Sequence, residues 1–192
     1  QTTMRTIQTT TLATALLAFA CLAGPLATDA QAKTTKADKA PKTEQADKSN
    51  PLDLIPAKGM IDAEGKEVTK DSLKGKIVGF YFSAHWCGPC RAFTPKLVEF
   101  RDANTKDFEV VFVSADQGKD KMLEYMKEAK MKWGGIPPDN EANAKLSQRF
   151  GVRGIPMLVI VGTDGKVISE NGRGDVTGNA KNAIKEWQKK KK

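Results

Sequence analysis

Apolar residues beyond residue 75 come in short unbroken runs that have the length of strands. Residues 76–83 (KIVGFYFS) and 108–114 (FEVVFVS) are rich in β-branched and aromatic side chains. A continuous run of this kind predicts a strand that is covered on both faces, as in a sheet between helices. Shorter apolar runs at 157–161 and 167–169 predict two further strands, and the Asp-Gly pair between them predicts a hairpin turn.

Helical periodicity fills the segments between these strands. Apolar side chains at three- and four-residue spacing predict helices over about 87–103, 120–131 and 141–150, and a last helix from about residue 177. Upstream, residues 60–68 predict a short hairpin with Gly65 at its turn, whereas residues 133–138 predict a turn region.

Strands that alternate with helices and end in a hairpin and a helix predict an α/β fold with a central mixed β-sheet flanked by helices.

The first 50 residues predict targeting and tethering rather than folded structure. Arg5 precedes an almost wholly apolar stretch at 12–23, and a small-residue site follows at 30–32 (AQA). The apolar stretch is shorter than the roughly 20 residues of a membrane span, and the whole pattern is typical of a secretory signal peptide over 1–32. Residues 33–50 lack large apolar side chains and predict a disordered linker. The folded domain is then 51–192.

Two alternatives for the N-terminal segment stay open. It could remain as an uncleaved membrane anchor, or Cys21 could carry a lipid at the end of a lipoprotein signal. The residues before Cys21, Ala18-Phe19-Ala20, lack the Leu of the usual lipoprotein pattern and include a bulky Phe. Simple cleavage is the expectation, with a periplasmic or secreted location, and membrane attachment follows only from the alternatives.

Charge and composition narrow the function classes. The chain of 192 residues carries 31 Lys and Arg against 23 Asp and Glu, a formal net charge of +8. No nucleic-acid fold signature accompanies that charge, and the Lys189–Lys192 run is expected to be a solvated tail, so no nucleic-acid partner is expected. One histidine and three cysteines are too few to suggest a four-ligand zinc site within one chain. No cofactor motif is present.

The chemistry is expected at Cys87-Gly88-Pro89-Cys90, directly after a buried strand and at the start of a helix. Cysteines three apart in a first helical turn face the same way, so they can form a disulfide. Unpaired N–H groups and the helix dipole stabilise a thiolate there. Cys87 is therefore expected to be an exposed nucleophile and Cys90 the resolving thiol, while Pro89 suits a helix start because it lacks an N–H. A structural disulfide or half of a zinc site are the competing interpretations.

Two longer stretches around this motif carry a resemblance to a known family. Residues 81–95 (YFSAHWCGPCRAFTP) resemble the active-site region of the thioredoxin superfamily, and most closely that of its tryparedoxin and nucleoredoxin branch. Residues 146–156 (LSQRFGVRGIP) resemble the segment that carries the cis-proline of that family. The resemblance covers residues 58–190 and implies a thioredoxin-like fold.

The resemblance also implies roles for individual residues. Cys87 and Cys90 match the nucleophilic and resolving cysteines. Trp86 matches the aromatic residue that covers the disulfide, although a partly buried packing role is also open. Ile155 and Pro156 match the loop that pairs with the substrate strand, with a cis bond before the proline. The candidate supporting residues are thus Trp86, Gly88, Pro89, Ile155 and Pro156.

One position departs from thioredoxins proper. They carry a buried Asp six residues before the first cysteine, which assists proton transfer from the resolving thiol, and this chain has Tyr81 there. The tryparedoxin-like branch also lacks that acid, so redox activity is still expected, but the proton acceptor is unassigned. His85 lies two residues before Cys87, and a surface position without a role is the expectation for it.

The sequence thus predicts a thiol–disulfide oxidoreductase that reduces or exchanges disulfides in protein substrates outside the cytoplasm. Its expected partners are proteins with disulfides or dithiols and an unidentified redox partner, and it is expected to act as a monomer without a cofactor. The alternative is a non-catalytic binding or scaffold module of the same fold, in which the disulfide is structural.

Cleavage after Ala32 predicts a mature chain that starts at Lys33 and therefore lacks Cys21. Mass spectrometry of the N-terminus of the protein purified from its natural host checks this prediction. A mature N-terminus at a lipid-modified Cys21 would contradict it.

Overall fold

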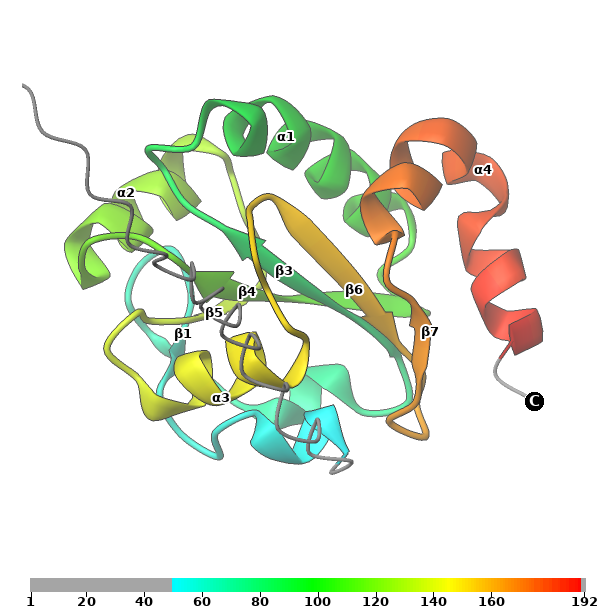
Figure 1. The fold of residues 1–192 in the computed structure, drawn as a ribbon, viewed down its shortest axis with the longest axis horizontal. Helices are drawn as coiled ribbons and strands as arrows, with labels where there is room; N and C mark the ends of the chain where they lie inside the picture. Colours follow the sequence, from blue (N-terminus) through cyan, green and yellow to red (C-terminus); the bar gives the residue numbers. More distant parts are fainter. Residues whose placement is uncertain (1–49, 191–192) are drawn as a thin grey trace, which may run out of the picture. The chain divides into compact units, whose positions relative to one another are not determined.

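The computed structural model describes residues 50–190, so the predicted signal peptide and almost all of the predicted linker lie outside the described residues. Within them, seven strands form one sheet in the order β2-β1-β5-β4-β3-β6-β7 (Figure 1). The strands are β1 (Met60–Ile61), β2 (Glu67–Val68), β3 (Ile77–Ser83), β4 (Phe108–Ser114), β5 (Gly134–Ile136), β6 (Met157–Val161) and β7 (Val167–Ser169). The helices are α1 (Gly88–Ala103), α2 (Lys119–Glu128), α3 (Glu141–Arg149) and α4 (Gly172–Lys190), with short 3-10 turns at η1 (Pro51–Leu54) and η2 (Lys70–Leu73).

The centre of the sheet is the part that the apolar runs predicted. Every residue of β3 and of β4 is buried, and the two strands pair in parallel from Ile77 with Phe108 to Ser83 with Ser114. On its other edge β3 pairs antiparallel with β6, which confirms a mixed sheet. The two predicted hairpins, β1–β2 and β6–β7, are also present.

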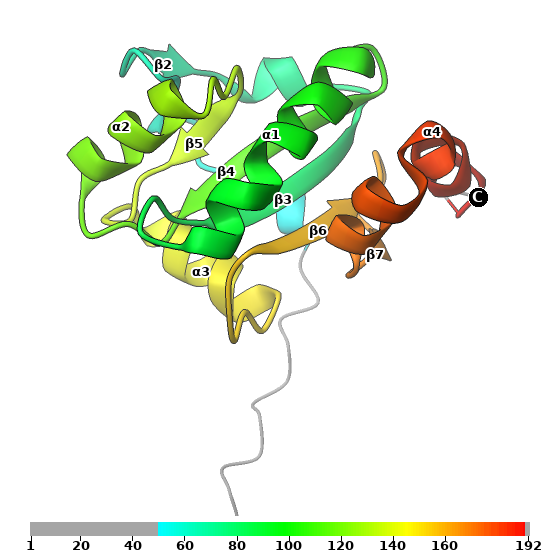
Figure 2. The ribbon, with the colours of Figure 1, turned by 90° about the horizontal axis from the view of Figure 1, so that it is seen from above.

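Helices cover both faces of the sheet, and the alternation along each strand decides which side chains meet which helix (Figure 2). Tyr81 and Phe112 point to the face that packs against α1, α2 and α4. Phe82 and Val113 point to the opposite face, where α3 and η1 pack. Successive side chains of a strand face opposite ways, so a strand between two helical layers needs apolar residues at nearly every position.

The predicted turn region at 133–138 is wrong, because Gly134–Ile136 forms β5. This strand pairs in parallel with β4 and antiparallel with β1. Its two glycines hide it from a pattern search, yet packing favours them: a Cβ on Gly135 would overlap the side chain of Met122 on α2 and crowd that of Phe112 on β4. The strand lacks side chains where α2 fills the space.

The last helix begins at Gly172, five residues before its predicted start near 177. Three glycines between 172 and 178 make this a poor helical sequence. Side-chain bonds hold it instead, since Asp175 Oδ2 accepts from Ser169 Oγ at 2.7 Å and from Trp187 Nε1 at 2.9 Å. The backbone is non-helical at Asn179, which interrupts α4.

A buried ion pair fixes the far end of α1 to the sheet. Arg101 donates from Nε and from one terminal nitrogen to the two carboxylate oxygens of Glu109, at 2.8 and 2.7 Å, and Lys76 Nζ lies 3.5 Å from the same carboxylate. The hydrogen bond to Glu109 raises the pKa of Arg101. Glu109 is only 4% exposed, so it depends on these partners.

No helix within residues 50–190 combines the length and the apolar character of a membrane span.

We expect Arg101→Met to lower the free energy of unfolding by about 3 kcal/mol, because the buried carboxylate of Glu109 then keeps only the backbone N–H of Val110 and the more distant Lys76 as partners. Chemical denaturation monitored by circular dichroism measures this. Lys121→Met is the matched control, since it removes the exposed pair between Lys121 and Glu124 (2.6 Å) and should leave stability unchanged. Equal effects of the two substitutions would contradict a special role for the buried pair.

Candidate active site

The cysteine pair lies where β3 ends and α1 begins. Cys87 is the N-cap of α1, and its sulfur accepts the backbone N–H of Cys90 at 3.3 Å. Cys87 and Cys90 form a disulfide, with their Cα atoms 5.2 Å apart. Gly88 and Pro89 occupy the first helical turn between them. The predicted disulfide at a helix N-terminus is therefore present, and the predicted helix start holds to within one residue.

The accessibility of this pair differs from the prediction. Cys87 was expected to be exposed, but it is 5% exposed, because Ala84 and Ile155 pack around it, and Cys90 is fully buried. Trp86, by contrast, is 63% exposed and is the one large apolar side chain exposed among the described residues. The partly buried packing role for Trp86 is therefore wrong. The predicted order, with Cys87 as the outer and Cys90 as the inner sulfur, agrees with the two exposures.

Three consecutive residues, the last of β4 and the two that follow it, hold the loop in front of the cysteines. Asp116 Oδ1 accepts the backbone N–H of His85 at 2.7 Å, and its Oδ2 accepts from Ser114 Oγ at 2.8 Å. The carbonyl oxygen of Ala115 accepts from Trp86 Nε1 at 3.2 Å. Although Asp116 is buried, its carboxylate is fully engaged, and it anchors the backbone from which Trp86 and Cys87 project.

His85 has more contacts than the expected surface position implies. Its ring stacks on that of Tyr125, with the centroids 5.6 Å apart, and its Nε2 lies 2.9 Å from Glu128 Oε2. Both partners belong to α2 and its C-terminal end, so His85 joins the active-site loop to that helix.

The loop before β6 closes the site from the other side. The peptide bond between Ile155 and Pro156 is cis, which confirms the isomer that the resemblance implied. The carbonyl oxygen of Ile155 lies 3.8 Å from the sulfur of Cys87. The structure therefore brings together all the residues that were predicted for this site.

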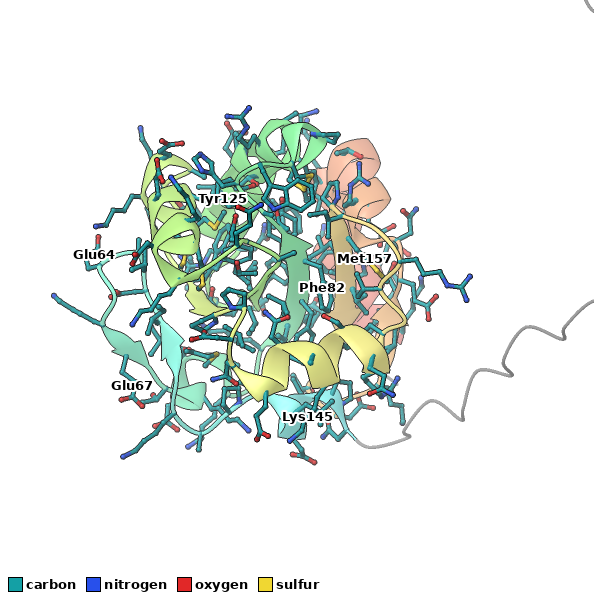
Figure 3. All side chains as sticks on the ribbon, turned by 60° about the vertical axis from the view of Figure 1, so that its left-hand side comes forward. Glu64, Glu67, Phe82, Tyr125, Lys145 and Met157 are labelled. Atoms are coloured by element: carbon teal, nitrogen blue, oxygen red, sulfur yellow. A yellow bond between two sulfur atoms is a disulfide. The ribbon has the colours of Figure 1, made fainter. Side chains whose placement is uncertain are left out.

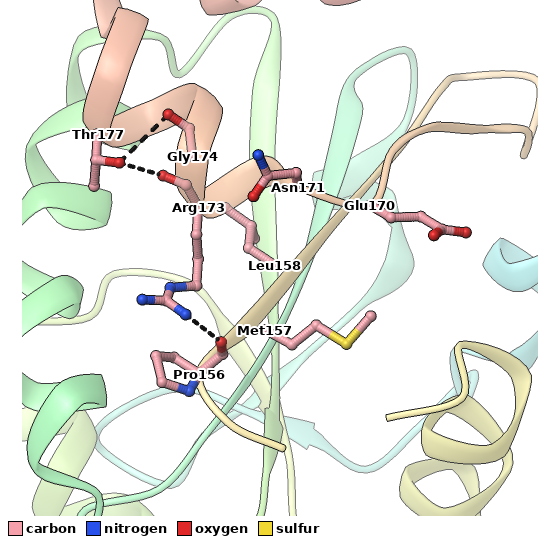
Figure 4. Close-up of a pocket in the computed structure, with 8 residues that line it drawn as sticks. All are labelled: Pro156, Met157, Leu158, Glu170, Asn171, Arg173, Gly174 and Thr177. Atoms are coloured by element: carbon pink, nitrogen blue, oxygen red, sulfur yellow. Dashed lines mark hydrogen bonds between the residues drawn. The ribbon is translucent and has the colours of Figure 1, made fainter. Parts of the chain in front are cut away.

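A hollow of about 320 Å³ is lined by Pro156 and by residues of β6 and α4 (Figure 4). Arg173, at the start of α4, donates to the carbonyl oxygen of Pro156 at 3.0 Å, and its guanidinium lies 5.7 Å from the centre of the Phe93 ring. Arg173 thus ties the proline loop to α1 and α4. Its side chain lines the hollow together with Met157, Glu170, Asn171 and Thr177.

Beneath Cys90 lies a group of buried hydroxyls in the region where thioredoxins carry an acid. Tyr81 OH and Thr94 Oγ1 both donate to the carbonyl oxygen of Cys90, at 3.3 and 2.9 Å. Burial raises the pKa of Tyr81, so this residue stays protonated and acts as a donor.

Sequence reasoning missed Asp116, the contacts of His85 and most of the buried hydroxyls beneath Cys90. One signal was available for Asp116: it follows the carboxyl end of a strand parallel to β3, the sheet edge at which α/β proteins place their functional residues. Thr94 is four residues after Cys90 on the same helix, a spacing that places its hydroxyl at the Cys90 carbonyl. Among residues 50–190, no cluster of three or more His, Cys, Asp or Glu could hold a metal ion.

Comparison with known proteins agrees with this geometry. Residues 75–167 match the family model described as thioredoxin-like. Over 118 residues the chain is 46% identical to a probable nucleoredoxin 1 of Arabidopsis thaliana, a match that covers 60% of this chain and 20% of that protein. The chain thus corresponds to a fraction of the length of that relative.

Solved structures give matches over nearly the whole of the other chain. A thioredoxin from Wuchereria bancrofti is 40% identical with a TM-score of 0.60, and the match covers 71% of this chain and 96% of that one. Tryparedoxin II from C. fasciculata is 35% identical with a TM-score of 0.62, over 69% of this chain and 90% of that one. The fold, the cysteine pair and these matches agree, and the chain belongs to the thioredoxin-like family, in the branch of the nucleoredoxins and tryparedoxins.

Proposed function

We propose that this protein is a thiol–disulfide oxidoreductase that reduces or exchanges disulfides in protein substrates outside the cytoplasm. The observation that carries the proposal is the Cys87–Cys90 disulfide at the N-terminus of α1, with the Ile155 carbonyl beside the outer sulfur. A disulfide that can open and close at a helix N-terminus exchanges two electrons with a substrate.

In the first step the reduced protein attacks with Cys87. The thiolate is favoured by the N–H of Cys90, which points at this sulfur, and by the positive end of the α1 dipole. A bond forms between the Cys87 sulfur and one substrate sulfur, and the substrate disulfide breaks. The other substrate sulfur leaves as a thiolate and takes a proton from solvent.

In the second step Cys90 releases its proton and attacks the Cys87 sulfur. The Cys87–Cys90 disulfide forms, the bond from Cys87 to the substrate breaks, and the second substrate thiol leaves. The substrate gains two electrons and two protons, and the protein dithiol is oxidised. A dithiol reductant must then restore the protein, or, in the reverse direction, the disulfide oxidises a substrate dithiol.

Two features next to the pair support a polypeptide as substrate. The Ile155 carbonyl is a backbone acceptor at the outer sulfur, suited to pairing with an extended segment. The exposed indole of Trp86, directly before Cys87, offers apolar contact area. The carbonyl suits the backbone of a polypeptide and the indole suits its apolar side chains, and neither is specific for one small molecule.

The proposed location outside the cytoplasm rests on the pattern of residues 1–32 alone, namely a basic start, a short apolar stretch and a small-residue site. An oxidising compartment would supply disulfide substrates and would require a separate electron donor for the reducing direction.

The second candidate is a scaffold module with a structural disulfide, and the low exposure of both cysteines is the observation in its favour. Such a disulfide would have a reduction potential below about −300 mV, and after reduction Cys87 would resist alkylation at neutral pH. A redox-active pair has a higher potential and a reactive Cys87.

Replacing the nucleophile should abolish turnover. We expect Cys87→Ser to reduce the rate of insulin disulfide reduction by dithiothreitol to the uncatalysed background, because the remaining sulfur of the pair, on Cys90, is fully buried and cannot start the exchange. Cys21→Ser is the matched control, and it should keep full activity. Substantial activity in Cys87→Ser would disprove the mechanism.

Replacing the resolving cysteine should stop the reaction at its intermediate. We expect Cys90→Ser to accumulate covalent complexes with protein substrates that dithiothreitol dissolves, seen as shifted bands on non-reducing gels and identified by mass spectrometry. The double variant Cys87→Ser with Cys90→Ser should form none. Complexes that persist in the double variant would show that they do not involve this site.

A further inference from the structure

Four buried hydroxyl groups form a closed ring beneath the cysteine pair. Tyr81 and Ser83 come from β3, Thr94 from α1 and Tyr125 from α2, which carries it into the interior (Figure 3). Ser83 Oγ donates to Tyr81 OH at 3.0 Å and lies 3.1 Å from Tyr125 OH. Thr94 Oγ1 lies 2.8 Å from Tyr81 OH and is also hydrogen-bonded to Tyr125 OH. None of the four residues is more than 1% exposed.

Within residues 50–190, the hydrogen bonds that leave the ring go to the inner cysteine. Both Thr94 and Tyr81 contact the carbonyl oxygen of Cys90. The Cys90 carbonyl and the Arg91 N–H belong to one peptide group, and that N–H donates to the carbonyl oxygen of Cys87 at 3.1 Å. Hydrogen bonds therefore run from the ring through one peptide group to the backbone of the outer cysteine.

A count of protons shows that the hydrogen bonds to the Cys90 carbonyl compete with those inside the ring. Four hydroxyls supply one proton each, whereas the four contacts of the ring and the two contacts to the Cys90 carbonyl make six. With each proton in one hydrogen bond, at most four contacts are bonded at a time. A proton that is donated to the Cys90 carbonyl is not available inside the ring. The hydrogen bonding of that carbonyl therefore depends on all four hydroxyls.

Donation to this carbonyl acts on the sulfurs through the peptide dipole. A hydroxyl that donates to a C=O polarises the peptide group, and the N–H of that peptide group becomes a stronger donor. In the first turn of α1 this enlarges the dipole whose positive end faces the cysteines and stabilises a thiolate there. Stabilising the reduced form makes a dithiol pair a better oxidant.

We propose that Tyr81, Ser83, Thr94 and Tyr125 are positioning residues that favour the reduced form of the cysteine pair by polarising the first turn of α1. The proposal rests on the proposed function, because it concerns the same redox couple. It assigns to neutral hydroxyls an influence on the cysteines in the region where thioredoxins carry a buried Asp.

The test measures the equilibrium of the pair with glutathione. The full chain is equilibrated in glutathione buffers at pH 7 and quenched, and the alkylated fraction of the peptide containing Cys87 and Cys90 is counted by mass spectrometry. Thr94→Val removes the strongest link to Cys90 while keeping the side-chain shape. We expect it to lower the dithiol-to-disulfide equilibrium constant by about two- to fivefold, which is part of the free energy of one hydrogen bond, because the bond is present in both redox states.

Further variants separate polarisation from packing. Tyr125→Phe removes one oxygen that contacts only the ring of hydroxyls and keeps the aromatic ring that stacks on His85. Because Thr94 gives its own proton to the Cys90 carbonyl, Tyr125 is the donor in its contact with Thr94. Its loss weakens Thr94 as a donor, so a shift in the same direction is expected. Thr94→Ser keeps the hydroxyl and should restore the wild-type constant. Ser72→Ala removes a surface hydroxyl that donates to the Thr69 carbonyl at 3.0 Å, and it should change nothing. Near-UV circular dichroism verifies that each variant is folded.

The outcomes also separate this inference from the proposed function. Wild-type constants for both Thr94→Val and Tyr125→Phe, or a shift toward the dithiol, would overturn the role of the ring while leaving the oxidoreductase intact. A wild-type pair that glutathione does not reduce at any ratio would instead remove the proposed function and this inference together.

Discussion

The active-site loop depends on a strand that is buried along its whole length. All seven residues of β3 are buried, and the strand pairs with β4 on one edge and with β6 on the other. Backbone hydrogen bonds to β4 and to β6 therefore hold the carboxyl end of β3 on both edges. They fix the position and direction in which the chain continues into the active-site loop. Cys87 follows within four residues and caps α1, so the position of the sulfur is determined by the most rigid part of the sheet.

Around that junction, three hydrogen bonds from two neighbouring parts of the chain hold the loops of the site in place. Asp116 holds the backbone of His85, and Ala115 holds the indole of Trp86. Arg173 holds the carbonyl of Pro156 from the opposite side. These attachments come from the loop after β4 and from the start of α4, so the outer sulfur lies between two loops that are anchored separately. Such anchoring preserves the geometry on which in-line attack at sulfur depends.

Pattern reasoning succeeded where one local rule decides the structure. The runs at 77–83 and 108–114 are apolar at nearly every position, and both proved to be central strands. The cysteine spacing and the following helix were equally local. Reasoning failed where a distant neighbour decides: Gly135 is in a strand because α2 occupies the space of its missing side chain, and Asp175 stabilises a glycine-rich helix start through Trp187.

The exposure of Cys87 and the hydroxyl ring belong to the same class of failure. A helix N-terminus predicts an accessible sulfur, but Ile155, from a different part of the chain, covers it. Tyr81 was recognised only as a missing acid, because the other ring members lie on three different elements and no spacing relates Tyr125 to Ser83. Side-chain networks that span several elements become visible only in three dimensions.

The contact between Cys87 and Ile155 joins residues that are 68 positions apart in the chain. The disulfide, by contrast, closes over a separation of three. A nascent or partly folded chain can thus acquire its oxidation state from a single helical turn, while the surface that would select a partner forms only after β6 has joined β3. Disulfide formation needs only local structure and partner selection needs the assembled sheet, so the two can be gained or lost separately during folding.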